Sequence, residues 1–317
     1  MKDRPNISGI VPVKDGANWI PYFLDHIREN LIQTDEMIFV DDSSSDETFS
    51  LLENAQYKES NIVVLKNPGK GIVSALNFGI SEARHNLIAR FDIDDTYAPF
   101  RIQKQIEAIG TEHGVCFSDY SFCGNGVSNL GYIASAIHPL SMEISLSKSQ
   151  RTAHPIALFR KEVFNEAGGY LDEDFPAEDL GLWFRMAKIA TLVSVPEELL
   201  FYNLRASSTS SQKRTSALLK KNSLVRENLN LYRHINRNFD SIFAEYESYE
   251  SHSHSFERKL HLLREMLELG DKVDLHSNYK KKLLLELGRL LLSFGNLVEL
   301  QRMNQYRKMR INLRKKL

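Results

Sequence analysis

The sequence predicts an α/β fold in which a mixed, mostly parallel sheet is flanked by helices and is followed by an all-helical C-terminal region. Three observations support this prediction. Short apolar runs alternate with amphipathic stretches through the first third of the chain, at the spacing of strands joined by helices. Acid-rich loops directly follow two of these runs, and after residue 212 only helical patterns remain. The 317 residues, 42% of them hydrophobic, suffice for one large domain or two.

The α/β part is expected to contain the following elements in chain order. Strands are predicted at residues 7–13, 36–40, 61–66, 87–91, 115–122, 192–195 and 199–202. Helices are predicted at residues 19–30, 48–55, 72–84, 100–109, 160–169 and 180–189. Because strands and helices alternate in the first half, those strands are expected to pair in parallel. Residues 124–149, rich in Gly, Ser and Asn, are expected to form a loop.

A Ser/Thr run at residues 207–211 predicts a boundary between two domains, 1–212 and 213–317. The first domain carries 18 Lys and Arg against 29 Asp and Glu, whereas the second carries 22 against 12. This asymmetry indicates two regions with different roles. Helices are predicted in the second domain at about residues 215–236, 256–269, 278–293 and 296–312.

The segment 302–317 holds seven Lys and Arg and no acidic residue, with apolar residues interspersed. Two interpretations remain open for it. It is either a basic amphipathic helix that lies on an anionic membrane surface, or a solvated face that closes a bundle or contacts a second copy in a homo-oligomer. No recognition motif for nucleic acid accompanies the charge, so no nucleic-acid partner is expected.

The cysteine content and the N-terminal sequence bear on localisation. Cys116 and Cys123 form no C-x-x-C pair, so a zinc site is not expected and a reducing cytosol fits. The first residues lack the apolar core of a signal peptide, and no window approaches about 18 apolar residues. We therefore expect a cytoplasmic protein, attached at most to the inner face of the cell membrane.

The run Asp92-Ile93-Asp94-Asp95 places three carboxylates directly after a predicted strand. Such closely spaced acids raise one another's pKa unless a positive charge lies among them. A divalent cation that also binds a phosphate-bearing substrate would supply that charge; the alternative is a solvated acidic loop. Asp41 and Asp42 follow another predicted strand, and ligands of open α/β sheets bind outside the carboxyl ends of the strands. Both loops are therefore expected to face one crevice.

Four segments in order resemble family 2 glycosyltransferases of the GT-A fold, of the bacterial polysaccharide, O-antigen and capsule type. They are I-V-P-V-K-D at 10–15, V-D-D-S-S-S-D at 40–46, D-I-D-D at 92–95, and H-P-I-A-L-F-R at 154–160 with E-D-L-G-L-W at 178–183. The resemblance covers about residues 7–210. It implies a Rossmann-like sheet and an inverting, metal-dependent enzyme. Such an enzyme moves a hexosyl or N-acetylhexosaminyl group from a UDP-sugar to a hydroxyl of a glycan or lipid-linked acceptor.

The resemblance implies a donor site. Pro12, Val13 and Asp15 would contact the nucleotide base, and Asp92 would bind the ribose or organise the site. Asp42 would accept a hydrogen bond from uracil N3–H, which suits a carboxylate because a carboxylate only accepts. The alternative for the second segment is a capping cluster for the helix at Thr48, a role expected of Asp46 in particular.

Two positions of the donor site depart from the family pattern. Ser43 stands where the family has Gly. Asn77 matches a donor-site position of the family's A-R-N-x-G, but the Arg is replaced by Leu76, so Lys70 or Arg90 would have to supply its contact. Arg205 is expected to clamp the donor phosphates.

The resemblance also implies the metal site and the catalytic residue. Asp94 would hold Mn²⁺ or Mg²⁺, which neutralises charge on the leaving nucleotide. Asp179 would be the general base that takes the proton of the acceptor hydroxyl, although an acid at a helix N-terminus is also stabilised by the helix dipole. Glu178 would orient Asp179 or the acceptor.

Two further residues of the acceptor half, His154 and Trp183, keep two interpretations each. Trp183 either stacks on a sugar or belongs to the core. His154 either approaches the metal or diphosphate or is a satisfied histidine before a proline.

Two other functions are alternatives to this one. A sugar-nucleotide nucleotidyltransferase would need a Gly-rich basic loop after the first strand, but the loop at residues 13–18 has a single glycine. A non-catalytic scaffold subunit that binds a sugar nucleotide or glycan is the second alternative, and the presence of Asp42, Asp94 and Asp179 argues against it.

Overall fold

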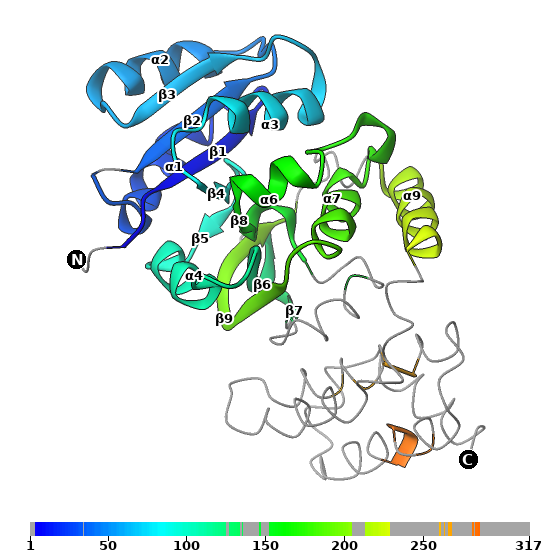
Figure 1. The fold of residues 1–317 in the computed structure, drawn as a ribbon. Coiled ribbons are helices and arrows are strands. Elements are labelled where there is room, and N and C mark those ends of the chain that lie inside the picture. Colours follow the sequence, from blue (N-terminus) through cyan, green and yellow to red (C-terminus); the bar gives the residue numbers. More distant parts are fainter. Residues whose placement is uncertain are drawn as a thin grey trace.

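The computed structural model describes residues 4–33, 35–124, 127–133, 135, 146, 152–204 and 213–228, and in the C-terminal region residues 260, 263, 266, 267, 281 and 283–285. Figure 1 shows a twisted sheet with helices on both sides, and α9 next to α7. No helix of the described part is long and apolar enough to cross a membrane.

One sheet of nine strands organises the described residues, in the order β3-β2-β1-β4-β8-β6-β9-β5, with β7 paired to β6. Its strands are β1 (Ile7–Val13), β2 (Glu36–Asp41), β3 (Ile62–Lys66), β4 (Leu87–Arg90), β5 (Thr96–Tyr97), β6 (Val115–Gly124), β7 (Val127–Ile133), β8 (Leu158–Arg160) and β9 (Leu192–Asn203). The helices are α1 (Ile20–Ile27), α2 (Thr48–Lys58), α3 (Gly71–Glu82), α4 (Arg101–Ile109), α6 (Lys161–Glu166), α7 (Glu178–Met186) and α9 (Arg214–Glu227). Short 3₁₀ turns are η1 (Arg28–Asn30), η2 (His154–Ile156) and η3 (Asp172–Asp174).

The first four strands pair in parallel, as predicted. β1 lies between β2 and β4, with Val13 opposite Asp41 and Ile10 opposite Arg90. The loops after β1, β2 and β4 therefore leave the sheet at the same edge. Beyond β4 the sheet is mixed, because β8 is antiparallel to both β4 and β6 whereas β6 and β9 are parallel. The prediction of a mixed sheet flanked by helices is confirmed.

An aromatic cluster fixes α1 and the end of β4 against the sheet. Phe23 of α1 meets Phe39 of β2 edge to face at 5.9 Å between ring centroids, and Phe91 at 6.2 Å. Phe91 in turn meets Tyr97 at 4.9 Å. Such pairs contribute about 0.5–1.5 kcal/mol each beyond the burial of their surface. The acidic loop after β4 thus begins and ends on residues that are anchored in the core.

Several elements differ from the prediction. β5 and β8 have two and three residues, too short to give a periodic signal. β7 lies where a loop was predicted, since its alternating pattern is diluted by Gly and Asn. The predicted strands 192–195 and 199–202 are one strand, β9, because Pro196 falls where the register with β6 shifts between Ser118 and Asp119. A proline is tolerated at such a bulge because no ladder hydrogen bond is lost.

The C-terminal region is described only in part. α9 overlaps the helix predicted at about residues 215–236, beginning one residue earlier, and buries Leu224 and Val225. Its Lys220 Nζ lies 3.8 Å from Asp174 Oδ1 of η3, the turn before α7. The other predicted C-terminal helices, the boundary at 207–211 and the segment 302–317 lie outside the described residues or are described at scattered positions only, so they stay predictions.

Candidate active site

The acidic run after β4 forms a tight turn, and the buried side chain of Tyr97 stabilises this turn by hydrogen bonds to Asp92. The buried Tyr97 hydroxyl accepts the Asp92 N–H at 2.6 Å and donates to the Asp92 carbonyl at 3.1 Å. The Asp95 N–H points to the same carbonyl at 3.4 Å. Because the turn is fixed at both ends, its three carboxylates have defined directions. Nothing in the sequence pattern singled out Tyr97, although it lies only two residues after the run.

The three carboxylates of the run differ in environment. Asp92 and Asp94 are partly exposed, whereas Asp95 is 2% exposed. Asp95 Oδ1 accepts the Asn203 N–H at 2.8 Å, and Oδ2 has no partner among the described residues. Burial, reinforced by the charges of Asp92 and Asp94, holds the pKa of Asp95 well above its ordinary value. Asp92 and Asp94 are therefore the two carboxylates of the run that a solute can reach.

Arg90 lies beneath this run and supplies positive charge to it. The side chain is 2% exposed, donates from NH2 to Asp92 Oδ1 at 2.8 Å, and also bonds the Phe91 carbonyl. An arginine buried in this way cannot reach a diphosphate outside the turn. The suggestion that Arg90 replaces the missing family Arg is therefore wrong, whereas Lys70 is exposed next to the N-terminus of α3.

Asp42 joins the loops after β2 and β3. Its Oδ1 accepts Asn67 Nδ2–H at 2.7 Å and the Gly71 N–H at 3.0 Å, so it lies at the N-terminus of α3. The helix dipole stabilises a carboxylate there, and a carboxylate has lone pairs left for a further donor. The N-cap residue of α2 is Glu47, whose side chain makes no capping bond, whereas Asp46 lies one residue earlier and its Oδ1 accepts the Thr48 N–H at 3.0 Å. Asp46 thus bonds the first residue of α2 without being its N-cap.

Asp15 ties the loop after β1 to the loop after β2. Its Oδ1 accepts the Ser45 N–H at 2.7 Å, a bond that lowers the pKa of Asp15, and its own N–H donates to Ser44 Oγ at 2.9 Å. Ser43 takes a left-handed φ of 61°, the conformation that the family's glycine adopts readily.

The end of β1 offers mainly its backbone to this crevice. Pro12 is partly exposed, whereas Val13 is buried and its carbonyl accepts the Asp42 N–H at 2.8 Å. The loops after β1, β2 and β3 are thus linked to one another by hydrogen bonds.

Glu178 and Asp179 begin α7. Glu178 is 8% exposed, and burial together with the charge of Asp179 raises the pKa of Glu178 to about 7. Asp179 is partly exposed, and its Oδ1 accepts the Leu180 N–H at 2.7 Å. The structure thus gives Asp179 the helix-terminal position that both interpretations require, and its role as a base stays a prediction.

Tyr170 is influenced by the charges of both the acidic turn and α7. Burial, and then the charges of Asp179, Glu178 and Asp92, raise the pKa of Tyr170, whereas Arg90 opposes them. The phenol is therefore within electrostatic reach of both acidic segments and keeps its proton. The sequence pattern alone does not single out Tyr170.

Asn77 and His154 hold Tyr170 in place. The Asn77 amide donates to the Tyr170 carbonyl at 2.9 Å and accepts the Tyr170 N–H at 3.0 Å. Both polar atoms of the Asn77 amide thus pair with the backbone of Tyr170, and the role of Asn77 in donor binding stays a prediction. His154 Nε2 lies 2.8 Å from the Tyr170 hydroxyl, and burial and Arg90 hold the pKa of His154 well below its ordinary value. His154 is thus neutral and satisfied at that nitrogen.

Trp183 belongs to the core. It is fully buried and meets Phe117 edge to face at 5.1 Å, with His154 and Phe159 each at 6.1 Å. No ring face is open to a sugar, so the stacking alternative is wrong. Trp183 instead packs edge to face against His154. Arg205 lies outside the described residues, and its role stays a prediction.

The carboxylates at the end of β4 suit a divalent cation that is shared with a substrate. No group of three or more His, Cys, Asp or Glu in the described part of the chain is arranged as a complete metal site. Asp92 and Asp94 nevertheless offer the hard oxygen ligands that Mg²⁺ and Mn²⁺ prefer, and Mg²⁺ commonly takes one or two carboxylates with substrate phosphates. Burial is the main cause of the raised pKa of Asp95, and the charges of Asp92 and Asp94 add to it. These residues therefore fit the expected ion.

Comparison with known proteins places this architecture in a family. Residues 8–168 match Glycosyl transferase family 2. An uncharacterized glycosyltransferase of Haemophilus influenzae is 26% identical over 252 residues, which cover 73% of this chain and 76% of that protein. The amylovoran biosynthesis glycosyltransferase AmsE of Erwinia amylovora is 26% identical over 198 residues, 60% of this chain and 72% of AmsE. Uncharacterized glycosyltransferases of three Rickettsia species are matched over about a third of their length.

Solved structures share the fold at low identity. TarS of S. aureus in complex with UDP-GlcNAc has a TM-score of 0.54 and 16% identity, over 97% of this chain and 79% of that chain. The mannosyltransferase PcManGT of Pyrobaculum calidifontis, in complex with GDP-Man and Mn²⁺, has a TM-score of 0.55 and 15% identity, over 94% of this chain and 88% of that chain. The sheet, the position of the acidic turn and the match over residues 8–168 lead to one assignment: this chain is a member of glycosyltransferase family 2 with the GT-A fold.

Proposed function

We propose that the protein is an inverting, metal-dependent glycosyltransferase that moves a sugar from a UDP-sugar to a hydroxyl of a glycan or lipid-linked acceptor. The observation that carries this proposal is the convergence of two acidic segments. Asp92 and Asp94 follow β4, Asp179 begins α7, and Tyr170 lies within electrostatic reach of both. One segment suits the donor diphosphate and its ion, and the other suits the acceptor hydroxyl.

The donor side of the proposal rests on the linked loops after β1, β2 and β3. Asp42 is held by Asn67 and Gly71 and keeps acceptor capacity for a base N–H. Uracil presents an N3–H, whereas cytosine presents an acceptor at that position, so a carboxylate selects uracil. TarS, a structural neighbour, was solved with UDP-GlcNAc.

Asp94, with Asp92 as its neighbour, would hold the cation. When bound, the ion neutralises the charge that develops on the departing nucleoside diphosphate. PcManGT, another structural neighbour, was solved with Mn²⁺. Arg90 holds Asp92 from beneath and so sets the direction of that carboxylate.

Asp179 would act as the general base. It accepts the proton of the acceptor hydroxyl while that oxygen bonds to the anomeric carbon, and the bond from this carbon to the diphosphate breaks on the opposite face. One base is enough for this inverting displacement, because no acid is needed on the leaving side. Glu178, with a pKa of about 7, is partly protonated near neutral pH, which lessens its repulsion of a charged Asp179.

The cellular setting that we propose is the synthesis of a surface polysaccharide. AmsE, a relative, is named for amylovoran biosynthesis. The basic segment 302–317 would keep such an enzyme near an anionic membrane surface, where lipid-linked acceptors are found.

The proposal is tested by assaying UDP-sugar hydrolysis and transfer with and without Mn²⁺, first on the natural protein and then on Asp94→Ala. We expect activity that requires the cation and falls by about 100-fold or more in the variant, since the ion stabilises the leaving group. Asp25→Ala is the matched control, because Asp25 is a carboxylate on α1 whose side chain is 81% exposed and pairs with Arg28. Full activity in Asp94→Ala would exclude the metal assignment, and UDP binding without turnover on any acceptor would favour a non-catalytic subunit.

A further inference from the structure

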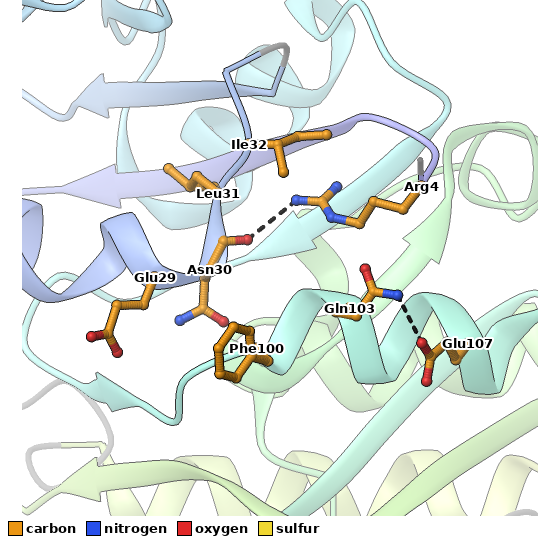
Figure 2. A pocket seen from close by; sticks show the side chains of 8 residues that line it. All are labelled: Arg4, Glu29, Asn30, Leu31, Ile32, Phe100, Gln103 and Glu107. Carbon is orange, nitrogen blue, oxygen red and sulfur yellow. Dashed lines mark hydrogen bonds between the residues drawn. The ribbon is translucent and has the colours of Figure 1, made fainter. Parts of the chain in front are cut away.

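A pocket lies beside the segments that lead into β1 and β2 and beside α4 (Figure 2). Its volume is about 260 Å³, and it is lined by residues before β1, in and after η1, and along α4: Arg4, Glu29, Asn30, Leu31, Ile32, Phe100, Gln103 and Glu107. Arg4 precedes β1 and Ile32 precedes β2, whereas Asp42 and Asp94 follow the carboxyl ends of their strands. The pocket is therefore separate from the candidate active site.

Asn30 is the unusual residue of this pocket. It is 4% exposed, yet neither Nδ2 nor Oδ1 of its side chain has a hydrogen-bond partner among the described residues. Leaving a buried polar group unpaired costs about 1–3 kcal/mol, and native structures contain few such groups. A primary amide of this kind is satisfied by a ligand that offers a donor and an acceptor on neighbouring atoms.

The charges of the pocket exclude an anionic ligand. The Arg4 guanidinium is already paired with Asp35, at 3.1 Å from NH1 to Oδ1, and also donates to the Asn30 carbonyl at 3.2 Å. Glu29 and Glu107 add two carboxylates, and Gln103 donates to Glu107 at 2.7 Å. These groups accept hydrogen bonds from hydroxyls and repel phosphates. A neutral ligand rich in hydroxyl groups fits this set.

Phe100 presents an aromatic ring to the same pocket. It is 60% exposed and takes a left-handed φ of 61°, an uncommon conformation for a bulky residue. In Figure 2 the Asn30 side chain points toward this ring. The face of an aromatic ring carries negative charge, which attracts the weakly positive C–H groups on the apolar face of a pyranose. An exposed ring next to an unpaired amide and carboxylates therefore matches a sugar.

We propose that this pocket binds one neutral hexopyranose unit of the acceptor glycan, away from the site of transfer. The inference rests on the proposed function in that the acceptor is taken to be a glycan. A second contact of this kind would hold a growing chain on the enzyme by raising the local concentration of its reactive end.

The test is direct binding of simple sugars to the full-length protein. Saturation-transfer difference NMR is recorded with the methyl glycosides of glucose, galactose, mannose and N-acetylglucosamine. We expect at least one glycoside to give a signal that Phe100→Ala reduces by about fivefold or more. Tyr57→Ala is the matched control, because Tyr57 is an exposed aromatic on α2 at 91% exposure, and this variant keeps the signal.

A second arm separates the pocket from the transfer site. Asn30→Ala is expected to weaken binding of the same glycoside. Its thermal unfolding temperature should be unchanged or higher, since an unpaired buried amide is removed. Asp94→Ala, and saturation with UDP, leave the signal in place because the pocket is separate from the candidate active site. If no glycoside binds, or if Phe100→Ala binds as well as the natural protein, the pocket proposal is overturned. Metal-dependent transfer by the same preparation shows that the proposed function survives that outcome.

Discussion

Asp179 and Glu178 are adjacent carboxylates in two environments, and our proposal gives them different roles on that basis. Asp179 is partly exposed at the first turn of α7, whereas Glu178 is buried beside it. We expect Asp179→Asn to keep UDP affinity within about twofold and to lower kcat for transfer by about 100-fold or more, because the amide cannot take a proton. Calorimetry with UDP and an assay of transfer measure the two quantities. Should transfer persist, the base is another residue.

Glu178 gives a pH dependence whose sign follows from its raised pKa. Between its ordinary 4.5 and about 7 the folded protein binds more protons at Glu178 than the unfolded chain does. The free energy of unfolding therefore falls as the pH rises through this window, by at most about 3 kcal/mol. Glu178→Gln is expected to remove this contribution, measured by denaturant unfolding at pH 5 and pH 7.5. Glu162→Gln, at an exposed position on α6, should keep the natural dependence, and an equal loss in both variants contradicts the assignment.

At the scale of single elements, the turn after β2 serves both the fold and the choice of base. Asp42 caps the N-terminus of α3 and, in our proposal, accepts uracil N3–H. Asp42→Asn keeps an oxygen for the Gly71 N–H but presents a donor where uracil also has one. We expect UDP affinity to fall about tenfold and the preference for UDP over CDP to be reduced, as measured by calorimetry. Asp46→Asn, in the same turn but bonded to α2, should keep that preference, and an unchanged preference in Asp42→Asn would contradict the base contact.

The elements also show which parts of the fold and site a sequence can predict. The strands β1 to β4 and the helices between them have long apolar periods, and each was predicted within a few residues. β5 and β8 are too short to show a hydrophobic repeat, and they form because the neighbouring strands offer backbone hydrogen bonds. The acidic residues were predicted as candidates, since their spacing is local. The hydrogen bonds between Asn77 and the Tyr170 backbone could not be predicted, because Tyr170 lies 93 residues away in the chain.

At the scale of the whole molecule, the site depends on contacts between distant segments. Arg90 of β4 bonds Asp92 and influences the pKa values of His154, Tyr170 and Glu178. α9, in the predicted second domain, brings Lys220 to Asp174 and adds the charge of Lys221 to the surroundings of Glu178. α9 is therefore electrostatically coupled to the proposed acceptor side, although it lies beyond residues 8–168, which match the family.

The basic segment 302–317 leads to the last prediction. With seven Lys and Arg and no acid, it should bind anionic vesicles with about 1 kcal/mol for each charge near the surface, and salt should weaken this binding. We expect co-sedimentation with vesicles containing phosphatidylglycerol, and not with pure phosphatidylcholine. Replacing Arg314, Lys315 and Lys316 by Glu should abolish it, whereas Lys188→Glu on the exposed surface after α7 should not. If vesicles are not bound and the same triple variant instead lowers the mass measured by light scattering, the segment is a contact between two copies of the chain.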